Sequence, residues 1–271
     1  MGKVAFITGA TRGVGKACAL KLASHGWDIA VAARSIQEDP RTPGTIFSAA
    51  EEIGQHGTKV LPVECNVVDL DSIEGAVAAT LDTFGRIDAV VNNAGALWWR
   101  PVEDTPMKRF DLVMNVNVRG AFAVTSGFLP IMKQQNSGHV IFMSPPIDLA
   151  IVPGHVAYAI SKFGMTMTAM GLAGEFEGTG ISATALWPRT IIESYATINF
   201  HMGLPSMWRK PDILADALYE ILQRPEETRG KALLDEDFLR SIGYTDFDQY
   251  KCEPDGQPLE LTSGIMRMSR F

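Results

Sequence analysis

The sequence predicts the α/β fold class, with one doubly wound parallel sheet of about seven strands and helices on both faces. Three observations support this prediction. Short apolar runs alternate with longer amphipathic stretches along the chain. The runs are continuously apolar, which is typical of parallel strands that are covered on both faces. The first run leads directly into a glycine-rich turn. Right-handed crossovers between such strands produce a doubly wound sheet.

The expected strands are the short apolar runs Val4–Thr8, Asp28–Ala33, Lys59–Val63, Ala89–Asn92, His139–Met143, Ile181–Leu186 and, more weakly, Lys231–Leu234. The expected helices lie near residues 15–24, 45–56, 70–83, 106–135, 154–177 and 211–223. No internal repeat, low-complexity tract or linker interrupts this alternation, so we expect a single domain over residues 1–271.

Three segments fall outside the regular alternation. Residues 34–44 are polar with two prolines, and we expect a loop after the second strand. Residues 188–210 follow the sixth strand and mix prolines with apolar side chains. Their part from 190 to 210 is equally consistent with a substrate lid and with a packed connection. Residues 235–271 form a C-terminal extension beyond the last expected strand.

Composition excludes several classes of protein. The net charge of −7 argues against a nucleic-acid partner, because neutralising phosphates requires clustered Lys and Arg. The three cysteines lie far apart, so neither a metal site nor a disulfide framework is expected. The chain has no continuous apolar run of about 18 residues, so no membrane span is expected. The first strand begins at once, without a signal peptide, and a cytoplasmic protein is the expectation.

A glycine loop separates the first strand from the first helix. Glycines in the spacing GxxxGxG permit a tight turn, and the following helix offers free N–H groups and the positive end of its dipole to a pyrophosphate. The strand before and the helix after this loop favour dinucleotide binding over a plain structural turn. The candidate binding residues are Gly9, Thr11, Arg12, Gly13, Val14 and Gly15.

The end of the second strand bears on the choice of dinucleotide. An acidic residue there would bind the 2′-hydroxyl of NAD, but the strand ends Val31-Ala32-Ala33-Arg34 without a carboxylate. Arg34 and Arg12 can converge on a 2′-phosphate from two sides. The sequence therefore favours NADP over NAD, although either arginine could also be a solvated surface residue.

The motifs taken together resemble a known family. The glycine loop at 9–15, Asn92-Asn93-Ala94-Gly95 after the fourth strand and Tyr158-Ala159-Ile160-Ser161-Lys162 resemble the short-chain dehydrogenases/reductases over nearly the whole chain. The resemblance implies a Rossmann fold, a nicotinamide cofactor and an oxidoreductase acting on a small carbonyl or alcohol.

Four further segments resemble one branch of this family, whose longer members carry a C-terminal sterol-carrier domain. They are MNVNVRG (114–120), MSPP (143–146), ALWPRT (185–190) and LLDEDFLRSIG (233–243). We expect no such domain here, and the terminal Ser269-Arg270-Phe271 is not a peroxisomal SKL-type signal.

The resemblance also implies roles for individual residues. Asn93, Ala94 and Gly95 would hold the adenosine side and stabilise the central sheet. Asn66 and Val67 fall where the family places an Asp-Val pair near adenine, and Pro188 and Ile191 fall near the nicotinamide. Asn117 matches the asparagine that anchors a water next to the catalytic lysine, and Asn115 is the less favoured candidate.

Tyr158 and Lys162 are four residues apart, so they share one face of a helix. Hydride transfer to a carbonyl leaves an oxygen that needs a proton, and an ordinary tyrosine has a pKa near 10. A neighbouring ammonium group and an oxidised nicotinamide would lower this pKa. We therefore expect Tyr158 to be the acid in reduction and the base in oxidation, and Lys162 also to hold the nicotinamide ribose.

The position of the usual serine departs from the family pattern. The family places a serine thirteen residues before the tyrosine, where this chain has Pro145, and Ser144 lies one residue earlier. In one hypothesis Ser144 donates to the substrate oxygen from its shifted position, and this is slightly favoured. In the other, Tyr158 polarises the carbonyl alone and turnover is slower. A cofactor-binding protein with weak or no turnover is the alternative function.

The candidate pocket residues are mostly apolar or aromatic, which suits a lipid-like, steroid-like or aromatic carbonyl. They are Trp98, Trp99, Ile147, Leu149, Val152, His155, Ile192, Tyr195 and the 195–208 loop. A homodimer or homotetramer is expected, because the family pairs helices near 106–135 and 154–177, where small apolar residues here permit close packing. Burial within one chain would explain the same residues.

Overall fold

The computed structural model describes residues 2–40 and 42–261. These residues form one seven-stranded parallel sheet in the order β3-β2-β1-β4-β5-β6-β7. The strands are β1 (Val4–Thr8), β2 (Asp28–Ala33), β3 (Val60–Glu64), β4 (Ala89–Asn92), β5 (Gly138–Met143), β6 (Ile181–Trp187) and β7 (Ala232–Leu234). The predicted doubly wound sheet is confirmed, with strand ends that differ from the expected ones by a residue or so.

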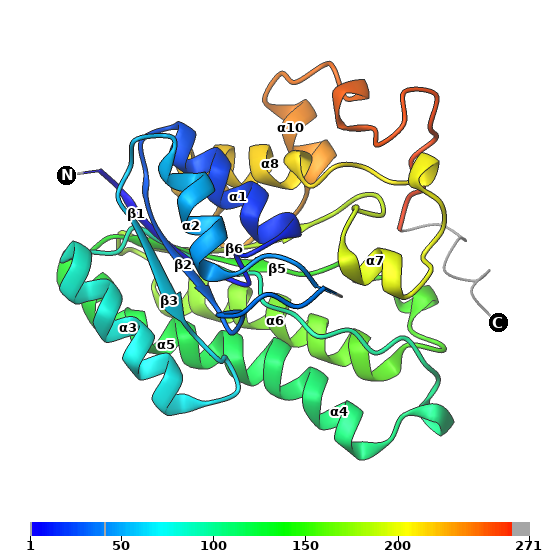
Figure 1. The fold of residues 1–271 in the computed structure, drawn as a ribbon, viewed down its shortest axis with the longest axis horizontal. Coiled ribbons are helices and arrows are strands. Elements are labelled where there is room, and N and C mark those ends of the chain that lie inside the picture. The colour runs from blue at the N-terminus through cyan, green and yellow to red at the C-terminus, as the bar shows by residue number, and fades with distance from the viewer. Residues whose placement is uncertain (1, 41, 262–271) are drawn as a thin grey trace.

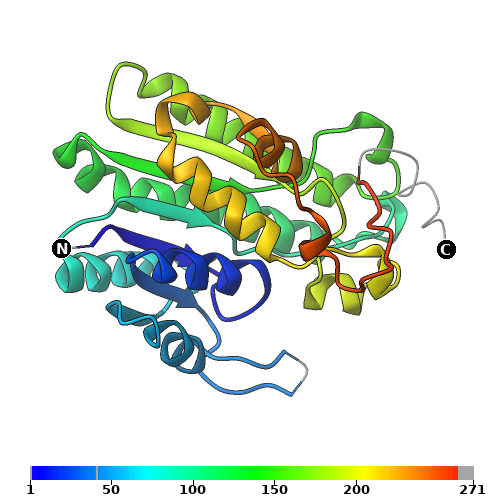
Figure 2. The same ribbon diagram turned by 90° about the horizontal axis from the view of Figure 1, so that it is seen from above.

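Helices cover both faces of the sheet (Figures 1 and 2). One face carries α1 (Gly13–Ser24), α2 (Ile46–Gly54), α8 (Asp212–Gln223) and α10 (Asp235–Ser241). The other carries α3 (Leu70–Phe84), α5 (Ala121–Gln135) and α6 (Val156–Glu175). Every residue of β1, β4 and β5 is buried, which is the physical reason why these runs are continuously apolar.

The expected helix over 106–135 is present but not uniform. It comprises α4 (Met107–Val113), a π-helical segment η2 (Met114–Gly120) and α5. By length and composition this stretch is apolar enough to cross a membrane, but such helices also occur in protein cores. Here Val124, Phe128 and Met132 are buried against the sheet, so it is a core helix.

Shorter elements lie mainly in the connections near the sheet's carboxyl edge and in the C-terminal extension. They are η1 (Val102–Asp104), η3 (Leu149–Ile151), α7 (Tyr195–Asn199), η4 (Pro205–Met207), α9 (Pro225–Thr228) and η5 (Asp248–Tyr250). The residues 269–271 discussed above lie outside the described part of the chain.

The C-terminal extension packs on the connection after β6. Ile191 and Trp208 of this connection form a buried cluster with Leu261. Backbone hydrogen bonds join Ile191 to Leu259, Trp208 to Cys252 and Arg189 to Leu261. Both ends of the 188–210 segment are therefore packed connections. Between them, Ile198 and Leu204 are exposed.

Candidate active site

The strand order reverses between β1 and β4, so the loops that follow these strands diverge at the carboxyl edge of the sheet. Ligands of open α/β sheets bind at such a switch point. The glycine loop follows β1, Asn93 to Gly95 follow β4, and Tyr158 lies in the first turn of α6. The topology therefore places the three sequence motifs on one edge of the molecule.

The three glycines of the loop meet different requirements. Gly9 and Gly13 have φ of +67° and +52°, in the left-handed region that favours glycine. A Cβ on Gly15 would lie 2.5 Å from both Asn93 Nδ2 and Gly9 O, so the close packing leaves no room for a side chain at this position. A Cβ on Gly13 would meet nothing within 4 Å. Open space above Gly13, at the start of α1, leaves room for the phosphates of a dinucleotide.

Thr8 and Asn93 join the two diverging loops. The Thr8 hydroxyl accepts hydrogen bonds from the backbone N–H of Asn93 (3.0 Å) and of Ala94 (2.9 Å). Asn93 Nδ2 donates to the carbonyls of Thr8 (2.9 Å) and Gly9 (3.2 Å). Asn93 thus braces the glycine loop as well as the central sheet. Thr8 was not among the predicted site residues, because its role depends on contact with a strand about eighty residues away.

Arg12 reaches the end of β2. Its Nη2 donates to Ser35 Oγ at 2.9 Å and to the Gly44 carbonyl at 3.0 Å, and its buried Nε has no hydrogen-bond partner. Arg34, next to Ser35 in the chain, is exposed. The structure therefore brings a guanidinium and a hydroxyl together at the end of β2, where the sequence analysis expects the 2′-phosphate. Ser35 is an addition to the predicted set, and its position directly after Arg34 could have indicated it.

The other predicted cofactor residues lie around this edge. Asn66 is half-buried after β3 and its N–H donates to Ser72 Oγ, while Val67 is buried in the core beneath it. Thr11 is buried, whereas Val14 and Pro188 are half-buried. Ile191 belongs to the cluster with Trp208 and Leu261.

Lys162 is buried one helical turn after Tyr158, with only 7% of its surface exposed. Its Nζ donates to the Met143 carbonyl at the end of β5, at 2.8 Å. Burial lowers the pKa of Lys162 from 10.5 to about 8. The carbonyl fixes the position of the ammonium group beside the loop after β4, where a Cβ on Gly95 would lie 3.5 Å from Nζ.

Asn117 is fully buried in the π-helical segment. Its Oδ1 accepts from the Ala96 N–H at 2.7 Å, and its Nδ2 donates to the Ala96 carbonyl and to Ser161 Oγ, both at 2.9 Å. π-helical turns are frequent at functional sites, because they turn a side chain out of the regular helical register. Asn117 links the loop after β4 to α6, whereas Asn115 is exposed.

The electrostatics of Tyr158 differ from the expectation. Burial raises the pKa of its phenol, and no contribution from Lys162 counteracts this. The protein by itself therefore keeps the phenol protonated, which is the form that a proton donor needs.

The Ser144 side chain is buried, and its hydroxyl has two partners within the protein. Its side chain is 3% exposed, and its hydroxyl lies 2.8 Å from Thr166 Oγ1 and accepts from Trp187 Nε1 at 3.1 Å. Successive side chains of a strand point to opposite faces, so Ser144 shares the α6 face with Phe142. Its hydroxyl belongs to a closed cluster with Thr166 and Trp187, and this placement favours the second hypothesis.

The predicted pocket residues do not share one environment. Trp99 lies edge-on to Tyr158 with ring centroids 5.6 Å apart and stacks on His155 at 3.6 Å. Ile192, by contrast, belongs to the core beneath α8. Ile147 and Leu149 are exposed, and Val152 is half-buried.

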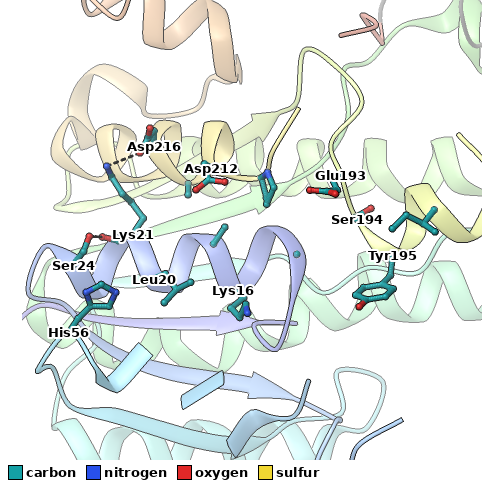
Figure 3. Close-up of a pocket in the computed structure, with 15 residues that line it drawn as sticks. Lys16, Leu20, Lys21, Ser24, His56, Glu193, Ser194, Tyr195, Asp212 and Asp216 are labelled. Atoms are coloured by element: carbon teal, nitrogen blue, oxygen red, sulfur yellow. Dashed lines mark hydrogen bonds and ion pairs between the residues drawn. The ribbon is translucent and has the colours of Figure 1, made fainter. Parts of the chain in front are cut away.

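A separate groove of about 580 Å³ runs between α1 and α8 (Figure 3). Tyr195 lines this groove. The Lys21 ammonium group on α1 forms an ion pair with Asp216 on α8, with Nζ 2.7 Å from Oδ1. The groove includes Gly13 but neither Tyr158 nor Lys162, so it borders the dinucleotide loop and is not the reaction centre. Within residues 2–40 and 42–261, no group of three or more His, Cys, Asp or Glu side chains could hold a metal ion.

Comparisons with known proteins agree with this geometry. Residues 3–197 match the family model described as short chain dehydrogenase. The chain is 44% identical over 262 residues to human hydroxysteroid dehydrogenase-like protein 2, covering 96% of this chain and 62% of that protein. It therefore spans about three fifths of the length of this curated relative.

Two solved structures are similar over most of the chain. A short chain dehydrogenase of Mycobacterium thermoresistibile is 38% identical with a TM-score of 0.89, covering 97% of this chain and 96% of that one. An alcohol dehydrogenase of the archaeon Thermococcus sibiricus, complexed with 5-hydroxy-NADP, is 27% identical with a TM-score of 0.75, covering 86% and 96%.

Proposed function

The chain belongs to the short-chain dehydrogenase family of oxidoreductases, and from this premise we propose that it transfers a hydride between NADP(H) and a carbonyl or secondary alcohol, with Tyr158 as the acid and base. One observation carries the proposal. Tyr158 and the buried Lys162 ammonium group lie one turn apart on α6, beside Asn117 and the loops that follow β1 and β4.

The side chains of this site divide the chemistry between them. A bound nicotinamide would supply or accept the hydride. In reduction, the Tyr158 phenol gives its proton to the substrate oxygen as negative charge develops there. Lys162 exchanges protons near neutral pH, because its pKa is about 8, so it can help to restore the phenol. In oxidation the same steps run backwards and require the phenolate.

The proposal of NADP rests on Arg12, Ser35 and Arg34. Arg12 is already held at the end of β2 by Ser35, and its unpartnered Nε fits an additional acceptor such as a phosphate oxygen. The Thermococcus sibiricus relative carries an NADP derivative. Arg34→Asp should shift the ratio of kcat/KM for NADPH over NADH towards NADH. An unchanged ratio would refute this assignment.

The substrate we propose is an apolar carbonyl compound of aromatic or steroid-like shape. Trp99 lies against Tyr158, and Trp98 is its neighbour in the same loop, so flat apolar surfaces surround the phenol. The name of the human relative points in the same direction.

The deciding experiment follows NADPH absorbance with aliphatic, aromatic and steroid ketones. The wild-type protein should reduce at least one of them, and Tyr158→Phe should abolish turnover while its Kd for NADPH stays within about twofold of the wild-type value, since a twofold change corresponds to only ~0.4 kcal/mol. A Tyr158→Phe variant as active as the wild type would refute the proposed role.

The second candidate function is a dinucleotide-binding protein without turnover, and Pro145 is the observation that favours it. Proline offers neither a hydroxyl nor an N–H to a substrate. Tight NADPH binding without oxidation by any ketone of the panel would support this candidate over the enzyme.

We also propose a homodimer or homotetramer that pairs the helices α4, α5 and α6. Large apolar side chains are exposed on these helices, which is typical of surfaces that another chain covers. They are Met107 (66%), Leu112 (37%), Phe122 (61%), Ile160 (45%), Met167 (68%) and Met170 (46%).

A further inference from the structure

His155 is the residue that precedes α6, and its side chain is only 6% exposed. Among the described residues, neither ring nitrogen, Nδ1 or Nε2, has a hydrogen-bond partner of good geometry, although the backbone of the adjacent Gly154 lies near the ring. In the described part of the chain, no other side chain has two buried polar atoms in this state. His139 is also buried, but its Nε2 lies 2.8 Å from Thr184 Oγ1. Leaving buried polar atoms unpaired destabilises the fold, and a bound ligand is one group that can supply the missing partner.

The position of His155 connects it to the phenol. It lies three residues before Tyr158, a spacing that places two side chains on the same side of a helix start. Trp99 contacts both residues, because its ring stacks on the imidazole with centroids 3.6 Å apart and planes 23° apart, and meets the Tyr158 ring edge-on at 5.6 Å. Stacking holds the imidazole plane and leaves the edge of the ring, with its nitrogens, as the part that can bond.

The polar groups that the sequence predicts for the catalytic site already have partners within the protein. Pro145 has no hydroxyl, and the Ser144 hydroxyl bonds Thr166 and Trp187. Lys162 Nζ is held by the Met143 carbonyl, and the amide of Asn117 by Ala96 and Ser161. Each of these polar groups already has partners within the protein.

We propose that His155 forms the second hydrogen bond to the substrate oxygen, next to that of Tyr158, and so takes the role that a serine hydroxyl at position 145 would have. The inference rests on the proposed oxidoreductase function. A neutral imidazole donates from one nitrogen and accepts at the other, as a hydroxyl both donates and accepts. It can therefore donate to a ketone oxygen in reduction and accept from an alcohol in oxidation, without losing or gaining a proton overall.

Two physical features suit this role. Burial lowers the pKa of His155 from its ordinary value of 6.5 and outweighs the opposite effect of the Gly154 backbone, so the ring stays neutral near pH 7. A donor held in place before the substrate arrives stabilises the charge that develops on the oxygen without reorganisation. Trp99 holds the ring in this way.

The test compares His155→Phe with the wild type on the ketone of the panel that the wild type reduces fastest. Phenylalanine keeps a ring for Trp99 to stack on but removes both nitrogens. We expect kcat/KM to fall by ~10²–10³, the usual effect of removing one preorganised donor. The Kd for NADPH should stay within about twofold, which also shows that the variant is folded. His155→Asn, which restores an N–H donor, should recover part of the loss.

His25→Phe is the matched control, because His25 also contacts an aromatic ring, that of Tyr219 with centroids 4.0 Å apart and planes tilted by 37°, but is exposed at the end of α1. It should leave kcat/KM unchanged. A second readout needs no turnover: in the complex of NADP⁺ with the same ketone, the ¹⁵N resonances of His155 should shift relative to NADP⁺ alone.

The outcomes separate the two proposals. If His155→Phe stays within about threefold of the wild type (a change of less than ~0.7 kcal/mol) while Tyr158→Phe is inactive, the role of His155 is refuted and the proposed function stands. A large loss in Ser144→Ala together with an active His155→Phe would assign the role to the shifted serine. A wild-type protein that reduces no ketone refutes the proposed function itself, and with it the role of His155.

Discussion

The ammonium charge of Lys162 destabilises the folded protein, but the proposed chemistry requires it. Its Nζ has the Met143 carbonyl and the Met165 sulfur, at 3.4 Å, as polar contacts, and no carboxylate of the described residues pairs with it. The lowered pKa means that the folded state disfavours the ammonium form relative to the unfolded chain. Such costs are typical of functional sites, where activity and stability compete.

Lys162→Met should therefore stabilise the protein at pH 7 while it abolishes turnover. The fall in pKa from 10.5 to about 8 corresponds to about 3 kcal/mol as an upper bound. Below pH 8 both states of the wild type are protonated and the full cost is present. Between pH 8 and 10.5 the unfolded chain retains a proton that the folded protein has lost. The free energy of unfolding of the wild type therefore rises with pH, and its difference from that of Lys162→Met becomes smaller. Urea unfolding of both proteins at pH 7 and pH 10 measures this difference, and a constant difference would contradict it.

Gly15 shows how one residue can depend on a distant part of the chain. Gly15→Ala places a Cβ 2.5 Å from Gly9 O and from the Asn93 amide. The glycine loop must then shift, and we expect Kd for NADPH to rise at least ~10-fold, which requires a change of only about 1.4 kcal/mol. Fluorescence titration with NADPH measures it.

Gly75→Ala is the matched control for this substitution. Gly75 is an exposed position of α3 where an added Cβ meets nothing within 4 Å. The change should leave NADPH binding unaltered and stabilise the helix by ~0.5–1 kcal/mol. Equal binding by Gly15→Ala and Gly75→Ala would count against the close packing of the glycine loop.

The connection after β6 and the C-terminal extension pack against each other. Trp208 is 5% exposed between Ile191 and Leu261, and its Nε1 donates to the Met202 carbonyl at 2.7 Å. Arg209 pairs with Glu236 of α10, and Arg189 with Asp237 and Glu260. These contacts tie the loop that would border the nicotinamide to the end of the described chain.

Trp208→Ala should reduce the free energy of unfolding by about 3–5 kcal/mol, as large-to-small changes of buried aromatic residues do. Because Ile191 packs on this side chain, KM for the dinucleotide should rise as well. Leu204→Ala is the control in the same loop, since Leu204 is 61% exposed, and it should change stability by no more than ~0.5 kcal/mol. Thermal unfolding and steady-state kinetics measure both effects, and equal stability of the two variants would show that the cluster does not anchor the loop.

The whole molecule leaves an apolar surface over α4, α5 and α6 that one chain does not cover. The double variant Phe122→Glu/Met167→Glu should convert the proposed dimer or tetramer into a 29.5 kDa monomer, because it introduces charges among these exposed apolar side chains. Light scattering of both proteins measures their masses. A wild-type protein that is itself monomeric would refute the assembly.

The fold was predictable because its causes are local and repeated. Continuous apolar runs, helical periodicity and a glycine turn directly after Thr8 each depend on neighbouring residues, and together they lead to a covered parallel sheet. The π-helical turn at Asn117 and the short elements of the C-terminal extension were not predictable from such patterns. They depend on which segments meet after the chain has folded.

The sequence by itself determined the sheet, the glycine loop and the Tyr158–Lys162 spacing, since covalent order and helix geometry are sufficient for these features. Only the tertiary structure decided which polar groups already have partners. Ser144 lies next to the expected serine position, yet its hydroxyl bonds Thr166 and Trp187, whereas His155 keeps two free nitrogens beside Tyr158. Hydrogen-bond partners come from distant segments, so the availability of a side chain for a substrate is a property of the folded molecule.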